Sequence, residues 1–202
     1  MLHKYRETQR GLMADTVFSK LRASAGDQDR SLQWYMRNVK TVVGSKLTPN
    51  QTLKSDIGTL VTNIDVGSMY LYFYDPKTKD TLPFYDTFPL VLPFSDAPGG
   101  FYGINLHYLP YMLRAKVLGE LLNYTDKNLT ASSRIKMSYQ FLTSLSVAKE
   151  IRPCIKRYLT THVKSRFMKI NPEDWKATIF LPVESFVGAT KEKVFRNSRG
   201  MI

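Results

Sequence analysis

Residues 67–110 decide the fold, and from Gly67 to Pro110 their sequence is GSMYLYFYDPKTKDTLPFYDTFPLVLPFSDAPGGFYGINLHYLP. Three apolar runs rich in Tyr and Phe are separated by Asp75-Pro76, by further prolines and by Gly99-Gly100. Aromatic residues favour strands, and Asp, Pro and Gly between them favour turns, so the pattern is typical of a small antiparallel β-meander. We expect its strands at about 68–74, 86–94 and 101–107.

The details of the meander predict a curved sheet. Alternation along the first strand places two sets of side chains on opposite faces. These sets are Met69, Leu71 and Phe73 on one face and Tyr70, Tyr72 and Tyr74 on the other. Pro89 and Pro93 indicate that the second strand lies at an edge or carries a bulge, and Gly99-Gly100 supplies the positive φ of a hairpin turn. Short curved strands with Pro and Gly at the corners predict a small SH3-like β-barrel, which residues 175–183 would help to close.

Helical patterns flank the meander on both sides. Apolar spacing and capping residues predict helices at 3–23, 29–43, 110–123, 131–147 and 153–165, with a short one at 184–187. Residues 44–66 are polar and are expected to form a connector. The sequence therefore predicts an α+β fold with an N-terminal helical segment (1–43), a connector (44–66) and a β-module (67–202). That module would carry a helical insertion at about 110–172 and a basic C-terminal tail from Lys191.

Charge is distributed unevenly along the chain. The 202 residues include 29 Lys and Arg against 17 Asp and Glu, a net charge of +12. Residues 63–106 carry a net charge of −3, whereas residues 149–202 carry +7. A nearly neutral β-core flanked by basic segments is typical of a protein that docks on other proteins and faces a polyanion.

The segment 149–169 is the candidate nucleic-acid site. If 153–165 is helical, Arg152, Lys156 and Arg157 share one face and could neutralise phosphates without reading bases. A solvated helix face, or a surface for acidic neighbouring subunits, is an equally compatible interpretation. The candidate nucleic-acid-binding residues are Arg152, Lys156, Arg157, Lys164, Arg166 and Lys169. A second candidate surface follows from the aromatic enrichment that protein interfaces share: the expected partner interface is Tyr70, Tyr72, Tyr74 and Phe84.

Chemistry-bearing patterns are weak. The histidines His3, His107 and His162 are isolated, and Cys154 has no evident base beside it. The acids Asp65, Asp75, Asp80 and Asp86 occupy turn and strand-end positions where they bond the backbone, which disfavours a metal-dependent nuclease. We therefore expect no enzyme, no metal and no cofactor. No stretch approaches the length of a membrane helix, so no membrane partner is expected.

Several motifs together suggest a family. They are MYLYFYDPK (69–77), KDTLPFYD (79–86), GFYGINLHYLP (100–110), PCIKRYL (153–159), FLPVE (180–184) and KVFRNSR (193–199). Through them, residues 67–200 resemble virion proteins of T-even-type contractile-tailed phages, and within that group the DNA end protectors, which are head-completion proteins.

The resemblance implies a non-enzymatic virion protein, made in the host cytoplasm, that binds the ends of packaged double-stranded DNA without base specificity. Its other partners would be neck, portal or baseplate subunits of a symmetric assembly. The alternative is a structural adaptor in the neck or baseplate that holds neighbouring virion subunits together.

Overall fold

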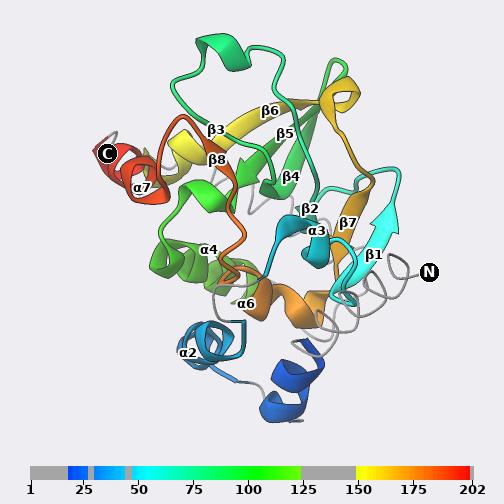
Figure 1. Cartoon of the computed structure of the whole chain (residues 1–202), viewed down its shortest axis with the longest axis vertical. Helices are drawn as coiled ribbons and strands as arrows, with labels where there is room; N and C mark the ends of the chain where they lie inside the picture. The colour runs from blue at the N-terminus through cyan, green and yellow to red at the C-terminus, as the bar shows by residue number, and fades with distance from the viewer. Residues whose placement is uncertain (1–17, 27–29, 44–46, 124–148, 201–202) are drawn as a thin grey trace, which may run out of the picture.

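The computed structural model describes residues 18–26, 30–43, 47–123 and 149–200. An antiparallel sheet forms one layer, and helices pack against one of its faces (Figure 1). The α+β class expected from the sequence is confirmed. The division of the chain at residues 43 and 66 into three parts stays a prediction.

The main sheet contains the expected meander at its centre. Its strand order is β1 (Gly58–Val61), β7 (Phe167–Ile170), β2 (Tyr70–Leu71), β4 (Leu90–Ala97), β5 (Gly100–Asn105) and β6 (Ile155–Leu159). Every pair is antiparallel. A separate pair joins β3 (Tyr85–Asp86) to β8 (Phe186–Val187). The meander β2-β4-β5 is thus extended on both sides by strands from distant parts of the chain.

The turns of the meander match the sequence prediction in part. The β4–β5 register shifts between Pro93 and Ser95, so Pro93 lies at a bulge of a central strand rather than at an edge. Pro98 and Gly99 form the hairpin turn, and Gly99 has φ +73°, which only glycine adopts easily.

The alternation predicted for the first strand is confirmed. One buried cluster contains Met69 and Leu71, with Phe73 packed against it, and it extends under the helices. The other contains Tyr70, Tyr72 and Tyr74 on the opposite face, together with Phe101 and others. The protein therefore has two cores, one on each side of the sheet.

The sheet curls around the tyrosine-rich core. Strands β2 and β6 are separated by β4 and β5, which would place them roughly 14 Å apart in a flat sheet. Nevertheless Tyr74, which follows β2, forms a β-bridge with Val163, which follows β6. Within the described residues the sheet has the open order given above and forms no closed barrel, so the SH3-like detail is not confirmed.

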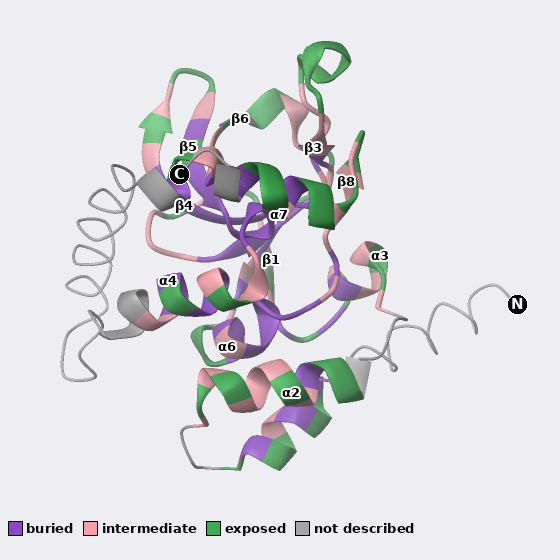
Figure 2. Ribbon diagram, turned by 90° about the vertical axis from the view of Figure 1, so that its left-hand side faces the viewer, coloured by how far each residue is buried: buried purple, intermediate pink, exposed green. Residues whose placement is uncertain are grey.

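The helices lie where capping and periodicity place them at three positions. They are 18–25, α2 (Leu32–Val43) and α4 (Tyr111–Asn123). The structure also has α7 (Lys191–Gly200) and the short α3 (Pro49–Thr52) and α6 (Trp175–Thr178). The first ends at Gly26 with φ +61°, and the Ser31 side chain accepts the Trp34 N–H at the start of α2. Short 3₁₀ turns are η1 (Lys79–Thr81), η2 (Leu106–Tyr108), η3 (Lys149–Cys154), η4 (Thr160–His162) and η5 (Pro172–Asp174). Figure 2 shows buried residues in the sheet and exposed ones along α7 and α2. The helix expected at 131–147 and residues 3–17 of the first helix lie outside the described residues.

The prediction of a helix at 153–165 is wrong. This segment forms η3, β6 and η4, and five residues of β5 pair with β6. The segment is rich in β-branched and aromatic residues, which favour a strand: Ile155, Tyr158, Thr160, Thr161 and Val163. Its sequence is compatible with both a helical and a strand periodicity, and pairing with the distant strand β5 selects the strand. The expected helical insertion at 110–172 consequently contains two strands of the main sheet.

Four further segments also differ from expectation. Residues 44–66 include α3 and β1, which pairs with β7, so the stretch is more than a connector. The strand expected at 175–183 is instead α6 followed by the buried run Ile179–Leu181, because a continuous apolar run does not distinguish a strand from other buried segments. The helix expected at 184–187 is β8. The basic tail is helix α7, held by the fully buried Val194.

The close approach of β5 and β6 at Gly100 gives a test of this register. A Cβ at Gly100 would overlap the Tyr158 carbonyl oxygen. We expect Gly100→Ala to lower the free energy of unfolding by about 1–3 kcal/mol, as overpacking does. Urea unfolding followed by circular dichroism measures the change.

The matched control is Gly119→Ala in α4, where an added Cβ would only touch Leu32 at 3.6 Å. This change should raise the free energy of unfolding by about 0.5–1 kcal/mol, the helix propensity difference. If the two variants were equally stable, β5 and β6 would not pair as described.

Candidate nucleic-acid interface

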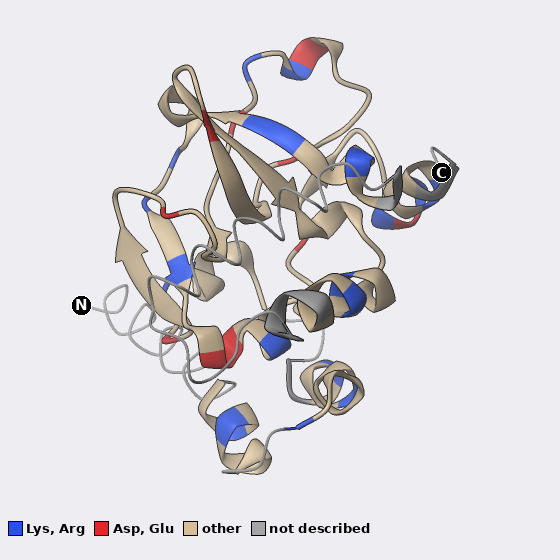
Figure 3. Cartoon of the chain, turned by 180° about the vertical axis from the view of Figure 1, so that it is seen from behind, with Lys and Arg blue, Asp and Glu red and all other residues tan. Residues whose placement is uncertain are grey.

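The structure brings part of the predicted basic set together at one end of the molecule. Lys and Arg residues occur in the loop that carries η1, on β6 and in the segment between η4 and β7 (Figure 3). The chain segments after β2 and after β6 run side by side here, because the Asp75 N–H donates to the His162 carbonyl and the Lys164 N–H to the Phe73 carbonyl.

Four cations belong to this region, which we call the β6 end and define as Lys77, Lys156, Arg157 and Lys164. Lys77, Arg157 and Lys164 are exposed. The pKa of Asp75 is lowered, first by its bond from Lys79 and further by Lys164 and His162, which shows that positive charge dominates around this carboxylate. Arg157 donates to the Pro98 carbonyl at 2.7 Å, which leaves its other guanidinium donors for a ligand.

The remaining predicted cations lie elsewhere or have partners. Arg166 is exposed two residues beyond Lys164. Lys169, in the interior of the sheet order on β7, bonds the Asp65 carboxylate at 2.6 Å. Arg152 lies in η3, which packs against α7 rather than against the η1 loop. A single helical face for the basic residues was therefore the wrong geometry, although several of them still share a surface.

The residues expected to face partners are mostly buried within this chain. Tyr70 and Tyr72 are fully buried, and Tyr74 is 7% exposed with its hydroxyl accepting the Leu159 N–H. Phe84 is half-buried, with its ring 6.0 Å from that of Tyr108. The tyrosines form the second core, because the curled sheet supplies the covering that the sequence alone assigned to neighbouring subunits.

A pocket opens at the β6 end. Its volume is about 460 Å³, within the range of about 300–1,000 Å³ typical of small-ligand sites. We call it the β6 pocket; its walls come from the η1 loop and β6, and its floor from β3, β5 and η2. The residues that line it are Tyr74, Pro76, Lys77, Thr78, Leu82, Tyr85, Asp86, Asn105, Tyr108, Lys156, Arg157, Tyr158 and Leu159.

Lys156 is the half-buried cation of this pocket. Its ammonium group lies 4.3 Å from the centroid of the Tyr108 ring, a cation–π contact. Burial lowers the pKa of Lys156, and among the described residues no carboxylate pairs with it. The positive charge is therefore only partly compensated by the protein.

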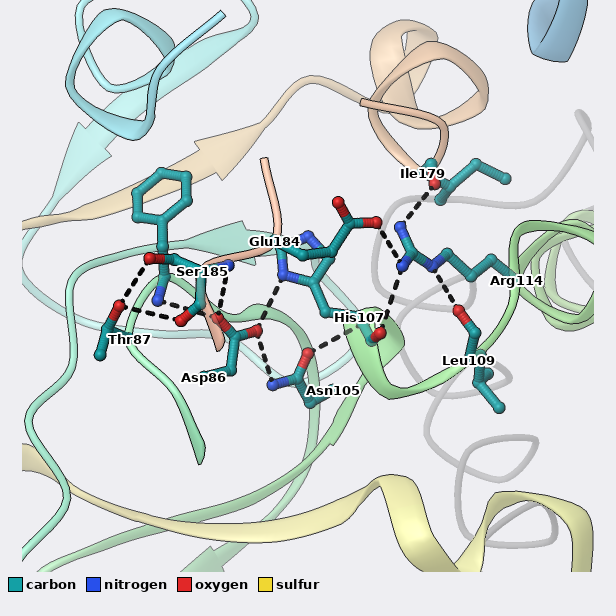
Figure 4. Close-up of polar contacts among 10 residues, drawn as sticks. Asp86, Thr87, Asn105, His107, Leu109, Arg114, Ile179, Glu184 and Ser185 are labelled. Carbon is teal, nitrogen blue, oxygen red and sulfur yellow. Dashed lines mark hydrogen bonds and ion pairs between the residues drawn. The ribbon is translucent and has the colours of Figure 1, made fainter. Parts of the chain in front are cut away.

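The pocket floor rests on a buried polar network (Figure 4). Asp86 lies 2.8 Å from His107 Nδ1 and also accepts from the Asn105 amide. Its other oxygen accepts the backbone N–H groups of Phe88 and Ser185. Burial raises the pKa of Asp86, but attraction to His107 and these hydrogen bonds outweigh it, so the pKa is below its ordinary value. Both oxygens are used, which leaves this acid no free site for a metal.

Arg114 joins the same network to α4. It is fully buried and donates to the carbonyls of Leu109, His107 and Ile179, and to the Glu184 carboxylate at 2.6 Å. Burial raises the pKa of Glu184, but Arg114 overcomes this and lowers it. The guanidinium thus ties the end of the meander, α4 and the segment before β8 to one another.

Sequence reasoning missed the η1 loop as part of the site. Lys77, Leu82 and Tyr85 lie between the expected strands 68–74 and 86–94, and nothing in their spacing indicates that this loop faces β6. One signal was present in retrospect: in a strand, Lys156 lies between the buried Cys154 and Tyr158 on one face. Among the described residues, no three His, Cys, Asp or Glu side chains are placed to hold a metal ion, and no helix is long and apolar enough to cross a bilayer.

The buried ion pair gives a stability prediction. Arg114→Met leaves the Glu184 carboxylate buried and unpaired, so the free energy of unfolding should fall by about 3–5 kcal/mol. In the double variant Arg114→Met/Glu184→Leu no charge is stranded, and much of the loss should be recovered. Urea unfolding measures both; a double variant no more stable than the single one would contradict this account.

The lowered pKa of Glu184 predicts a pH dependence. A carboxylate with a lowered native pKa adds stability above its ordinary pKa of about 4.3, and this stability is lost as the pH falls through the native value. The difference in unfolding free energy between wild type and Glu184→Gln should therefore be full at pH 6 and shrink below about pH 4. Exposed Glu192→Gln in α7 is the control and should show no such trend. A difference that grew on acidification would have the wrong sign.

Comparison with known proteins identifies the family of this chain. The chain matches no curated protein and no solved structure significantly. The family model described as phage T4 terminal DNA protecting protein matches residues 15–199, which is most of the chain and includes the β6 pocket and the network beneath it. This protein therefore belongs to the phage T4 terminal DNA protecting protein family.

Proposed function

We propose that this protein binds the ends of packaged phage DNA through phosphate contacts, without reading bases, and shields those ends from exonucleases. The observation that carries the proposal is the gathering of exposed cations at the β6 end: Lys77 and Arg157 line the β6 pocket, and Lys164 lies on the segment that pairs with the residues after β2. Membership of a family described as DNA protecting suggests that the ligand is DNA. Backbone contacts by Lys and Arg fix a protein on DNA but carry no sequence information.

The described surface supports contact with the backbone rather than base readout. The β6 end consists of loops and an edge strand, since β6 has no strand neighbour beyond β5 within the part of the chain that the structure describes. A helix that could enter the major groove is the usual device for reading bases. Among the described residues, those that line the pocket belong to loops, to strands β3, β5 and β6 and to the single 3₁₀ turn η2.

We further propose a virion location, with other head or neck proteins as neighbours and no catalytic activity of its own. The family resemblance supports this part of the proposal. The adaptor alternative relied on Tyr70, Tyr72 and Tyr74 as a contact surface, and their burial removes that support.

The test uses the exposed cations. The triple variant Lys77→Gln/Arg157→Gln/Lys164→Gln should weaken binding to a blunt linear duplex and reduce its protection from a processive exonuclease. The slope of log affinity against log salt should become less steep by about 0.9 for each lost phosphate contact. Binding across a salt titration and digestion by gel provide the two measurements.

The matched control removes the same charge from other surfaces. Lys20→Gln/Arg37→Gln/Lys193→Gln changes three exposed cations on the first helix, α2 and α7. This variant should retain the wild-type slope and protection. Equal losses in both triple variants would show that only net charge matters, and the assignment of the β6 end would be abandoned. Duplexes with different terminal base pairs should bind with similar affinities.

A further inference from the structure

Binding of the backbone of a continuous duplex does not require a pocket such as the β6 pocket. Phosphate contacts along a duplex require only exposed cations on a surface. Here a cavity of about 460 Å³ extends between the η1 loop and β6 to a floor at Asn105 and Tyr108. A cavity of this volume accommodates a small molecule or a single nucleotide rather than a duplex.

The pocket offers one uncompensated cation and several flat walls. Lys156 lies over the Tyr108 ring, and Lys77 and Arg157 also line the pocket. Asp86 is the sole acid among the described residues that line it, and its oxygens already accept four hydrogen bonds. An anionic group is therefore favoured beside Lys156.

The walls favour a flat, partly apolar group attached to that anion. Four tyrosines, at positions 74, 85, 108 and 158, are among the residues that line the pocket, together with Leu82, which is 40% exposed. Tyr74, Tyr108 and Tyr158 are buried, so the half-buried Tyr85 is the most accessible of the four. Aromatic side chains bind nucleobases by stacking, whatever the base. Anion, flat ring and small size together describe a nucleotide.

We infer that the β6 pocket receives the nucleotide at the end of a DNA strand, with its phosphate at Lys156 and its base against the tyrosine-lined wall. The inference rests on the proposed function and adds the means by which an end is distinguished from internal DNA. A terminal base is stacked on one side only, so it leaves the helix at lower cost than an internal base. An internal nucleotide is continued by the strand on both sides and would have to lose its stacking on both faces to enter the pocket.

The first experiment uses the isolated group. Thymidine 5′-monophosphate should bind the full-length protein and shift the signals of pocket residues in an NMR titration, and thymidine, which has no phosphate, should bind more weakly. Lys156→Met keeps the length of the side chain without its charge and should weaken nucleotide binding at least about tenfold, the effect of one charge-assisted hydrogen bond. Lys20→Met, an exposed lysine on the first helix, should bind like wild type. Absence of nucleotide binding, or equal binding by Lys156→Met, would overturn the inference.

The second experiment separates the pocket from general DNA binding. Affinities are measured for an open duplex and for a dumbbell of the same sequence whose ends are closed by hairpin loops. Wild type should prefer the open duplex, and Lys156→Met should lose that preference while its affinity for the dumbbell changes little. If Lys156→Met weakened both DNAs equally, Lys156 would be an ordinary backbone contact and the pocket inference would fail, although the proposed function would stand. If wild type bound both equally, the proposed function itself would fail.

A further variant guards against misfolding of Lys156→Met. Leu82→Glu changes an exposed residue of the pocket lining to a carboxylate that would repel the phosphate, and Met112→Glu, at a residue 57% exposed on α4, is its matched control. We expect the first to reduce the open-to-dumbbell preference and the second to leave it unchanged. The opposite ranking would count against the pocket.

Discussion

Arg114 is a fully buried cation, and it organises the side of the protein on which the pocket is built. A buried charge is costly unless its donors are all used and an anion lies close. Arg114 meets that demand with three carbonyls and the Glu184 carboxylate. Those partners come from η2, the segment after it, the run after α6 and the segment before β8. Each of these segments must therefore be in place at once. Asp86 repeats the arrangement, because its buried carboxylate accepts hydrogen bonds from Phe88, from Asn105 and His107 and from the segment before β8. These two buried charges therefore tie together the segments that form and support the pocket floor.

The parts of the fold that the sequence predicts are those with local signals. The tyrosine and aliphatic faces of residues 69–74 follow from alternation, and the turn at Pro98-Gly99 follows from its residues. Helix α4 follows from a helix-starting Pro110 and apolar spacing. The segments that were mistaken, β6 and the run 175–183, have patterns compatible with more than one structure. Their conformation is decided by what they pack against: β6 by pairing with β5, and the later run by burial under the sheet.

The site was predictable in residue type but not in arrangement. Lys156, Arg157 and Lys164 were singled out from charge, and they lie near one another for a reason unrelated to a helix face. The segments after β2 and after β6 run side by side, held by backbone hydrogen bonds of Asp75 and Lys164, and this pairing brings the three cations together. For Tyr70, Tyr72 and Tyr74 the prediction of a partner interface is not supported. The abundance of aromatic residues suggested an interface, but the curled sheet buries these side chains within the protein. Contacts between residues about 90 positions apart leave no trace in local spacing.

The strand order also determines when the protein can fold. β2, β4 and β5 leave the ribosome together, but β7 and β6, which flank them in the sheet, are encoded after residue 148. Until then both edges of the meander lack their partners, and unpaired edges are templates for pairing with other chains. Long-range pairing of this kind also slows folding. The prolines and the bulge in β4, together with the +12 net charge, would limit such association while the chain is incomplete. The same topology means that completion of the sheet and formation of the β6 pocket are one event, so a chain that has not yet added β6 lacks the pocket.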